Sequence, residues 1–515
     1  MNRQRRNSEA EHRALYKRTS ISRKPEELMK RRMAIDEALR KKHREQLITA
    51  KRFRNLTRRE EYESAGEDEP ELEKTSEHDD EISPYYRLTP GQVQALANDL
   101  RSSDVSTRIE AAQYIGKFVL EPAEALIKYI TEGDCILALT QMISGPNLEE
   151  QIEAAQTISN IAAGPYELWK KSTLAVPYLI SLLDSDNMNL REIAAGALGN
   201  MAAEDLGDMN DEDDKIRAMI RNNGAIKPLA RMLDTNDVRL IQSACFALAN
   251  LARGEEKELE EFLNVGLIDK LEKHLSDDND TITEICWTIS YLTAGSEKCR
   301  QQVMNKGLAA PLVSVLVSLS EQGSLVLPVL RTLGNLCGSD DNLKVLADQP
   351  GLLSTVIKLV NSEERIIKKE ALWVLSNITS TDNRYIIEQV EELHAIDSLS
   401  ELLTRGAFDI RKGAAYCIMN IANHGPEHLD QLCHKRLLPS FLDLLRSQEA
   451  EMIRLALGYI ELLLTQSAKG KEAIDAVPEC MEALAAVTPA PDQELFVFAN
   501  RLVDQYFGES PDMQD

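Results

Sequence analysis

The sequence is poor in aromatic residues and contains no long apolar run. Phe, Trp and Tyr make up 5% of the 515 residues, although hydrophobic residues together reach 43%. Leu, Ala, Ile, Glu and Lys dominate, a mixture that favours helices over sheets. The longest apolar stretch, residues 308–319, contains Pro311 and is shorter than the roughly 18–20 residues that a membrane span needs. The composition therefore predicts a helical chain without a membrane span.

Targeting and catalytic signatures are missing as well. No apolar region lies near the N-terminus, so we expect no secretory signal peptide. The eight cysteines are scattered without a C-x-x-C pair, which indicates small buried residues in a reducing compartment. There is no Gly-rich phosphate loop, no G-x-S-x-G motif and no Cys–His pair placed for nucleophilic catalysis. We therefore expect neither an enzyme nor a cofactor.

Three histidines lie near one another in the sequence: His424, His428 and His434. The first two are four residues apart, but Gly425 and Pro426 between them exclude a regular helix. The three could hold a metal ion, although a loop joining two helices explains them better. We expect no metal site.

Charge is unevenly distributed along the chain. The net charge is −25, yet the first 60 residues hold 20 Lys and Arg against 8 Asp and Glu. An acidic body should repel nucleic acid and attract basic peptides, whereas a basic arm suits an acidic partner. We therefore expect a protein partner for each part and no direct binding of nucleic acid.

Three segments precede or follow the body. Residues 1–58 form a basic arm, in which Pro25 and the acidic residues after it begin a helix over about 25–53. Residues 59–84 are acidic, lack an apolar pattern and predict a disordered linker. Residues 85–507 form the globular body, and 508–515 a disordered tail.

The body contains a repeat of about 42 residues. An Asn that follows an apolar helical pattern recurs, or is replaced at the same register, at steps of 39 to 50 residues: Lys117, Asn160, Asn200, Asn250, Tyr291, Asn335, Asn377, Asn420, Glu461 and Asn500. Gly224, Gly266 and Gly307 each end one helix and open the next, about 26–28 residues before this position. The period and the pair of short helices predict an all-α, right-handed superhelical armadillo solenoid of about ten repeats.

The recurring Asn stands on the same helix face as the residue four positions before it. Trp373 and Asn377 are the best-preserved pair. A row of Asn side chains can donate to and accept from an extended peptide backbone, and aromatic rings between them can hold the aliphatic stems of Lys and Arg. The alternative is that each Asn only satisfies a neighbouring backbone group, and the repetition favours the peptide ladder.

The ladder and the arm together resemble the importin-α family of nuclear import adaptors. The arm carries basic clusters in the order of that family's importin-β-binding segment, and the resemblance covers about residues 24–507. It implies an adaptor of cytoplasm and nucleus that binds basic nuclear localisation signals in an acidic groove. Importin-β is the implied second partner, and an exportin and nucleoporins stay open as further partners.

The resemblance also implies three sets of binding residues. The better-preserved C-terminal half of the groove comprises Trp287, Tyr291, Arg331, Asn335, Asp341, Glu370, Trp373, Asn377, Tyr416 and Asn420. The weaker N-terminal half comprises Asn160, Asn200, Glu204, Phe246 and Asn250. The importin-β-binding arm carries Arg31, Arg32, Arg40, Lys41, Lys42, Arg44, Lys51, Arg52 and Arg54.

The N-terminal half is expected to be weaker because the family's three tryptophans are replaced there by Gln156, Gly196 and Phe246. Two further hypotheses follow. The arm could fold back into the groove as a tethered basic peptide. Alternatively, the chain is an armadillo scaffold for protein–protein interaction that carries no cargo.

Overall fold

The computed structural model describes residues 88–119, 122–164, 166–203, 211–253, 259–447, 449–477, 479–487 and 493–507. Every regular element within these ranges is a helix. The chain divides within one helix, between Cys299 and Arg300, into two compact units that we call the N-terminal and the C-terminal unit. The helical class predicted from the composition is confirmed.

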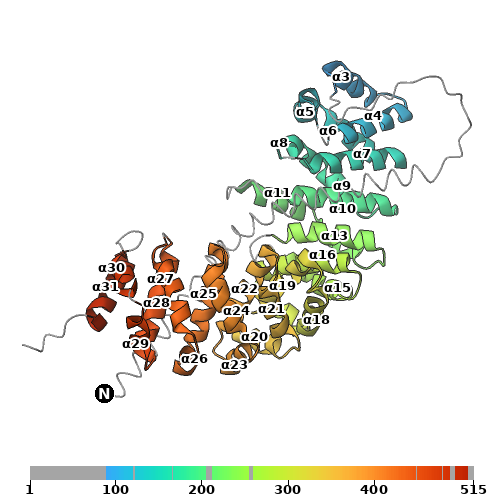
Figure 1. Ribbon diagram of the computed structural model, residues 1–515. Helices are drawn as coiled ribbons and strands as arrows, with labels where there is room; N and C mark the ends of the chain where they lie inside the picture. The colour runs from blue at the N-terminus through green and yellow to red at the C-terminus, as the bar shows by residue number, and fades with distance from the viewer. Residues whose placement is uncertain are drawn as a thin grey trace, which may run out of the picture. The chain divides into compact units, whose positions relative to one another are not determined.

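The helices of the N-terminal unit follow the repeat that the sequence predicts (Figure 1). They are α3 (Pro90–Asp99), α4 (Val105–Phe118), α5 (Glu124–Thr131), α6 (Cys135–Ser144), α7 (Leu148–Ala162), α8 (Tyr166–Trp169), η1 (Lys170–Ala175), α9 (Val176–Leu182), α10 (Met188–Ala202), α11 (Asp211–Asn222), α12 (Ile226–Met232), α13 (Val238–Leu251), α14 (Glu260–Asn264), α15 (Leu267–Glu272) and α16 (Asn279–Gly295). Helix α17 (Glu297–Asn305) contains the division between the units.

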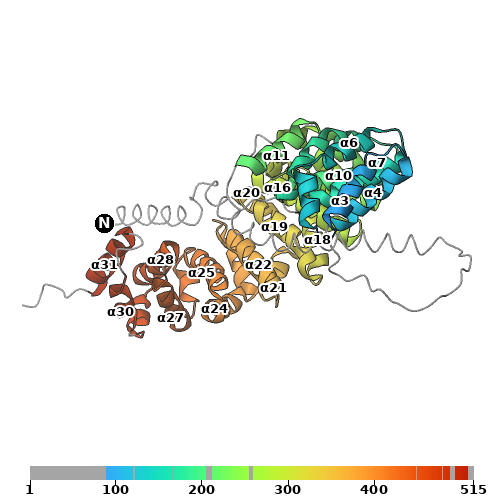
Figure 2. The same cartoon turned by 90° about the horizontal axis from the view of Figure 1, so that it is seen from above.

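The C-terminal unit continues with the same grouping of short helices before a longer one (Figure 2). Its helices are α18 (Ala309–Leu319), η3 (Gly323–Val326), α19 (Leu327–Leu336), α20 (Asp340–Ala347), α21 (Leu352–Val360), α22 (Arg365–Thr379), α23 (Arg384–Glu392), α24 (Ala395–Arg405), α25 (Phe408–Ala422), α26 (Pro426–Asp430), α27 (His434–Leu445), α28 (Ala450–Gln466), α29 (Gly470–Asp475), α30 (Glu479–Ala485) and α31 (Gln493–Phe507).

The last helix of each repeat, here called a ladder helix, carries the recurring Asn position. The ladder helices are α4, α7, α10, α13 and α16 in the N-terminal unit, and α19, α22, α25, α28 and α31 in the C-terminal unit. Within each unit, successive ladder helices pack against one another, and Figure 1 shows α7, α10, α13 and α16 lying side by side. Equivalent side chains of neighbouring repeats are therefore brought together within each unit.

Small apolar residues allow this close packing. In α10, Ala194, Ala195, Ala197 and Leu198 are fully buried. Every third or fourth residue of a helix lies on the same face. Stripes of apolar residues on a ladder helix are therefore buried against the ladder helices of the two neighbouring repeats. A repeat buries part of its apolar surface within itself, as between α24 and α25, and the rest against its neighbours, which explains why the fold is built as a stack.

Glycines in the left-handed conformation separate the first helix of a repeat from the second. Gly224, Gly266, Gly307 and Gly351 have φ between 65° and 93°, and His394 takes the same role in the next repeat with φ 57°. Glycine adopts this conformation without a steric penalty, so it ends a helix and turns the chain at once. The breaks predicted at Gly224, Gly266 and Gly307 are confirmed.

The two units start their ladder helices differently. In the N-terminal unit every ladder helix begins at an Asp or Asn whose side chain accepts a backbone N–H of the first turn, as Asn187 does from Leu190 at 3.1 Å. These caps are Asp104, Asn147, Asn187, Asp237 and Asp278. In the C-terminal unit, the residues before α19, α22, α25 and α28 make no such bond. A cap of this kind stabilises a helix by about 1 kcal/mol.

Candidate functional site

The recurring Asn side chains hold neighbouring repeats together. The Nδ2 of Asn160 donates to the Gly116 carbonyl at 3.1 Å, and that of Asn377 donates to the Gly334 carbonyl at 3.0 Å. Each acceptor belongs to the ladder helix of the preceding repeat. The bonds from Asn200 to Ser159 at 3.3 Å and from Asn420 to Ser376 at 2.9 Å follow the same pattern. The donor side of the amide ladder is thus part of the scaffold.

Asn250 differs from the other ladder asparagines. Its Nδ2 donates to the Phe246 carbonyl within its own helix, at 2.9 Å. The side-chain oxygens of the ladder asparagines are the atoms that could bind a peptide. Among the described residues, no donor reaches the side-chain oxygen of Asn200 or Asn250. An amide oxygen in this state can accept an N–H from an extended peptide.

Aromatic rings of the ladder lie on glycines of the preceding repeat. A methyl group placed on Gly199 would lie 2.5 Å from the ring of Phe246, and one placed on Gly334 would overlap the indole of Trp373. Real side-chain atoms do not approach so closely, so only glycine leaves room for the ring. Trp373 and Asn377 therefore both seat on Gly334, the indole over its Cα and the amide on its carbonyl.

A second aromatic pair lies on α16. Trp287 and Tyr291 are four residues apart, and their rings stack with centroids 5.9 Å apart and an interplanar angle of 25°. Both residues are partly exposed. They present one aromatic surface in the N-terminal unit, as the i and i+4 spacing predicts.

Arg331 and Glu370 bind each other. Arg331 Nε donates to one carboxylate oxygen of Glu370 at 2.9 Å and its Nη2 donates to the other at 3.1 Å. The side chains are 7% and 9% exposed, and they join α19 to α22. A two-point pair of this geometry satisfies both charges inside the protein. Sequence reasoning assigned both residues to a bound peptide and missed that they are each other's partner.

Charged side chains also join the next ladder helices of the C-terminal unit. Lys412 Nζ on α25 lies 2.8 Å from Glu449 and 3.4 Å from Glu451 on α28. The Tyr416 hydroxyl donates to the same Glu451 carboxylate. Asp341, by contrast, is 98% exposed at the start of α20, 3.9 Å from Lys344. Of the acids predicted to pair with a peptide in this unit, Asp341 faces solvent and Glu370 is buried.

The N-terminal unit lacks rings at two ladder positions. Gln156 donates from Nε2 to the Asn160 Oδ1 at 2.9 Å. It therefore occupies the side-chain oxygen of Asn160, where an aromatic residue would place a ring. Gly196 has no side chain, and a methyl group there would meet only the Ser159 Oγ, at 4.0 Å. Phe246 is the first aromatic ring of this register.

Comparisons with known proteins identify the repeat and the family. The family model of the armadillo/beta-catenin-like repeat matches residues 175–203 and 213–253. An engineered protein of known crystal structure aligns with a TM-score of 0.70 and 26% identity, covering 81% of this chain and 98% of its own. Importin subunit alpha-2 of Oryza sativa subsp. japonica is 30% identical over 92% of this chain and 91% of its own length.

Importin subunit alpha-9 of Arabidopsis thaliana is likewise 30% identical, and the match covers 93% of this chain and 94% of the relative. The chain belongs to the importin-α family. Importin-α proteins as a family are nuclear import adaptors that shuttle between cytoplasm and nucleus and bind cargo and importin-β, and membership supports the adaptor role at the level of the family. The armadillo solenoid predicted from the repeat period is confirmed, and its relatives are not enzymes.

Part of the predicted importin-α site lies outside the described residues. Glu204 precedes α11 in a stretch that the structure does not describe. The same holds for the whole basic arm, whose predicted contacts are Arg31, Arg32, Arg40, Lys41, Lys42, Arg44, Lys51, Arg52 and Arg54. The predictions for these residues stand untested by the fold.

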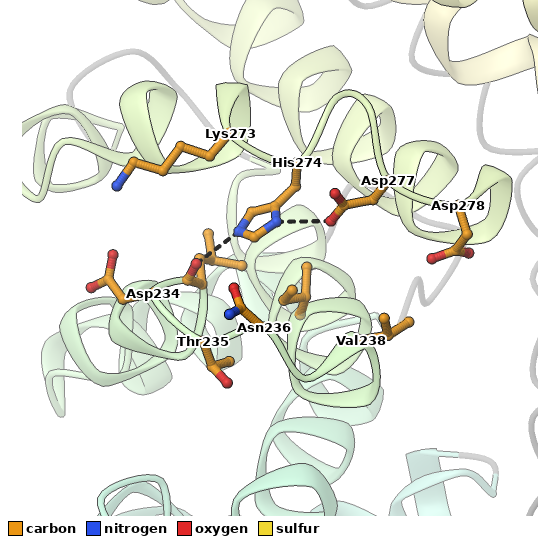
Figure 3. Close-up of a pocket in the computed structure, with 10 residues that line it drawn as sticks. Asp234, Thr235, Asn236, Val238, Lys273, His274, Asp277 and Asp278 are labelled. Atoms are coloured by element: carbon orange, nitrogen blue, oxygen red, sulfur yellow. Dashed lines mark hydrogen bonds and ion pairs between the residues drawn. The ribbon is translucent and has the colours of Figure 1, made fainter.

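A cavity of about 590 Å³ lies at the N-terminal end of the ladder helix α13 (Figure 3). It is lined by Val238 and Ile241 of this helix and by the turns that follow α12 and α15. His274 lies at its wall, with Nε2 2.8 Å from the Leu233 carbonyl and Nδ1 2.8 Å from Asp277 (Figure 3). Of its other acids, Asp234 pairs with Lys270 at 2.5 Å and Asp278 caps α16. These contacts tie adjacent repeats and assign the cavity to the scaffold.

The histidines 424, 428 and 434 do not converge on one site: His424 lies edge-on to His428, with ring centroids 6.1 Å apart, and the other two have polar partners elsewhere. His428 Nδ1 lies 2.7 Å from Glu391, and His434 Nδ1 lies 2.8 Å from the Tyr459 hydroxyl. No group of three or more His, Cys, Asp or Glu in the described ranges is placed to hold a metal ion. His428 joins two repeats, whereas His434 joins two helices of one repeat.

Most of the cysteines are buried packing residues, as the sequence predicts. Seven of the eight are buried, with Cys433 exposed. Burial raises the pKa of the Cys286 and Cys337 thiols to about 12, so both stay protonated at neutral pH. Within the described residues no single helix is long and apolar enough to cross a bilayer, and the only combination that reaches this length, α17 with α18, is bent by 91°.

Proposed function

We propose that this importin-α family member binds basic nuclear localisation peptides along its ladder helices and couples to importin-β through its basic arm. The observation that carries the first part is the seating of Trp373 and Asn377 on Gly334. The next ladder helix, α25, repeats the amide contact from Asn420 to Ser376 at 2.9 Å and places Tyr416 one turn before it. Two successive repeats thus offer the same aromatic and amide pattern.

The pattern suits an extended basic peptide. Partly exposed rings such as Trp373 can cover the aliphatic stem of a lysine and attract its ammonium group. Their seating on the preceding repeat fixes the rings before a peptide arrives, which lowers the ordering cost of binding. The predicted residues of this half are Trp287 and Tyr291 on α16 and Arg331, Asn335, Asp341, Glu370, Trp373, Asn377, Tyr416 and Asn420 in the C-terminal unit.

Residues that already bond to one another within the protein are not available to contact the peptide directly. Arg331 and Glu370 are buried against each other, so in this proposal they position α22. Contact with the peptide falls to the rings and to Asp341, the most exposed acid of the set. A lysine ammonium near Asp341 would be a solvent-exposed pair of modest strength.

Calorimetric titration of the full chain with a lysine-rich peptide tests this part. Trp373→Ala is expected to weaken binding by about 0.5–2 kcal/mol, because one cation loses its aromatic partner. Tyr385→Ala on α23 is the matched control, since this ring is 59% exposed and lies off the ladder helices. Equal affinity of wild type and Trp373→Ala would contradict the proposal.

The arm is tested with importin-β itself. Changing Arg40, Lys41, Lys42 and Arg44 together to Glu is expected to abolish binding, because the resemblance places them in the importin-β-binding segment. Changing Arg3, Arg5, Arg6 and Arg13 to Glu reverses the same number of charges outside that segment. Binding that is lost equally in both variants would indicate an unspecific charge effect and sink the assignment.

A further inference from the structure

A polar slot lies between the ladder helices α7 and α10. We use this name for the space over Gly196 of α10 beside Ser159 of α7, together with the polar side chains of Gln156, Asn160 and Asn200 on the same two helices. The slot exists because Gly196 stands one turn before Asn200, where α13 has Phe246 and α22 has Trp373. A methyl group on Gly196 would meet a single atom, the Ser159 Oγ at 4.0 Å.

Packing does not explain this glycine. Gly199 and Gly334 also lie inside ladder helices, and each is covered by an aromatic ring that excludes a Cβ atom. Gly196 carries no such ring, and glycine is unfavourable in a helix interior. Its effect in the structure is to leave space on the ladder face.

The slot is rich in hydrogen-bond acceptors. Gln156 uses its nitrogen on Asn160, at 2.9 Å, and Asn200 uses its nitrogen on the Ser159 carbonyl, at 3.3 Å. Among the described residues no donor reaches Gln156 Oε1, Ser159 Oγ or Asn200 Oδ1. These two helices therefore carry three acceptor oxygens that no donor of the described residues reaches, and one of them, the Ser159 Oγ, lies beside the space over Gly196.

Helix α7 is acidic. It carries Glu149, Glu150 and Glu153 and no basic residue, but Glu150 is already paired with Arg108 of α4, and α10 carries Arg191. A guanidinium group has five N–H donors in one plane and no acceptor, so it can reach several oxygens at once. A lysine ammonium is a smaller point donor that gains more from a carboxylate or an aromatic ring.

We propose that this slot binds an arginine side chain of an extended basic peptide in preference to lysine. The inference rests on the proposed function and adds a residue preference to the N-terminal half of the ladder. Asn250 and Phe246 continue the same face on α13, so the arginine is held next to a ring and a further amide. The two halves of the ladder would then select different basic residues.

Fluorescence anisotropy with the full chain tests the preference, using a labelled peptide of six arginines and one of six lysines. Ser159→Ala removes one acceptor without harming the helix. It is expected to weaken arginine-peptide binding by about tenfold, as for a hydrogen bond to a charged group, and to leave lysine-peptide binding within about twofold. Gly196→Trp fills the slot and is expected to remove the arginine preference.

Gly91→Trp is the control for an added tryptophan, because Gly91 is exposed and has no neighbour within 4 Å. A ratio of arginine to lysine affinity that stays the same in Ser159→Ala and Gly196→Trp overturns the inference. If wild type still binds and Trp373→Ala weakens it, the proposed function survives that failure. If neither peptide binds wild type, both proposals fall.

Discussion

The N-terminal and C-terminal units build the same repeat but stabilise it differently. Ladder helices of the N-terminal unit begin at side-chain caps, such as Asn187 and Asp278. In the C-terminal unit these caps are absent before four ladder helices, and charged pairs join each ladder helix to the next. The pairs are Arg331–Glu370, Arg365–Asp409 with Lys369–Asp409, Lys412–Glu449 with Lys412–Glu451, and Arg501–Glu461.

The difference teaches where the units can bind. In the C-terminal unit a charged pair joins each ladder helix to the next, so the proposed peptide would depend on rings there. In the N-terminal unit the pairs Arg108–Glu150 and Arg239–Glu192 also join ladder helices, but the caps lie at the helix ends, and no donor of the described residues reaches the Ser159 Oγ. Four experiments test this contrast.

The largest effect is expected from Glu370→Ala. It leaves Arg331 buried without its carboxylate, which destabilises by about 3–5 kcal/mol. Denaturant unfolding followed by circular dichroism measures the loss. The control is Glu321→Ala, which breaks an exposed pair with Lys358 and should cost less than about 1 kcal/mol. Similar losses in the two variants would show that the buried pair has no special weight.

Two glycines on the ladder should respond in opposite directions to the same change. Gly334→Ala forces a methyl group into the indole of Trp373 and is expected to destabilise by about 1–3 kcal/mol. Gly196→Ala meets no close neighbour and is expected to stabilise by about 0.5–1 kcal/mol, since alanine suits a helix better. Thermal unfolding distinguishes the signs, and a shared sign contradicts the packing described for Trp373.

Caps can be removed from one unit and added to the other. Asn187→Ala is expected to destabilise the N-terminal unit by about 1 kcal/mol, because α10 loses the bond from Leu190. Ala407→Ser adds a cap before α25, where the backbone is extended as a cap requires, and should stabilise the C-terminal unit. Hydrogen exchange of the first turns of α10 and α25 reports each change locally. An unchanged α25 would mean that the charged pairs there already suffice.

The smallest effect concerns the pH dependence of Asp409. Burial raises its pKa, but the hydrogen bond from Arg365 and the charge of Lys369 outweigh this and hold the pKa below its ordinary value. A carboxylate with a lowered folded-state pKa stabilises above its unfolded pKa of about 3.9, and this contribution is lost as the pH falls through the folded value. Asp409→Asn should therefore destabilise by about 0.2–1 kcal/mol at pH 7 and have no effect at about pH 2. A difference that persists in acid would point to shape instead of charge.

The sequence predicts the fold better than the use of each side chain. The repeat period and the left-handed glycines such as Gly224 follow from local chemistry, so they can be found without a structure. The seating of Trp373 on Gly334 leaves a trace too, since a small residue recurs just before the Asn position. What cannot be found is which neighbour a polar group prefers. Arg331 and Glu370 are 39 residues apart, and no pattern tells whether they meet each other or a ligand.

The ladder amides connect binding to the spacing of the repeats. Asn200 holds Ser159 of the preceding repeat with its nitrogen, while its oxygen faces no donor among the described residues. A pull that separates α7 from α10 would therefore act on the same side chain that is proposed to hold a peptide. Repeats whose ladder asparagines hold a peptide should resist such stretching more than repeats without a peptide. A stretched solenoid should conversely release its peptide. The stiffness of the solenoid should therefore depend on whether a peptide is bound.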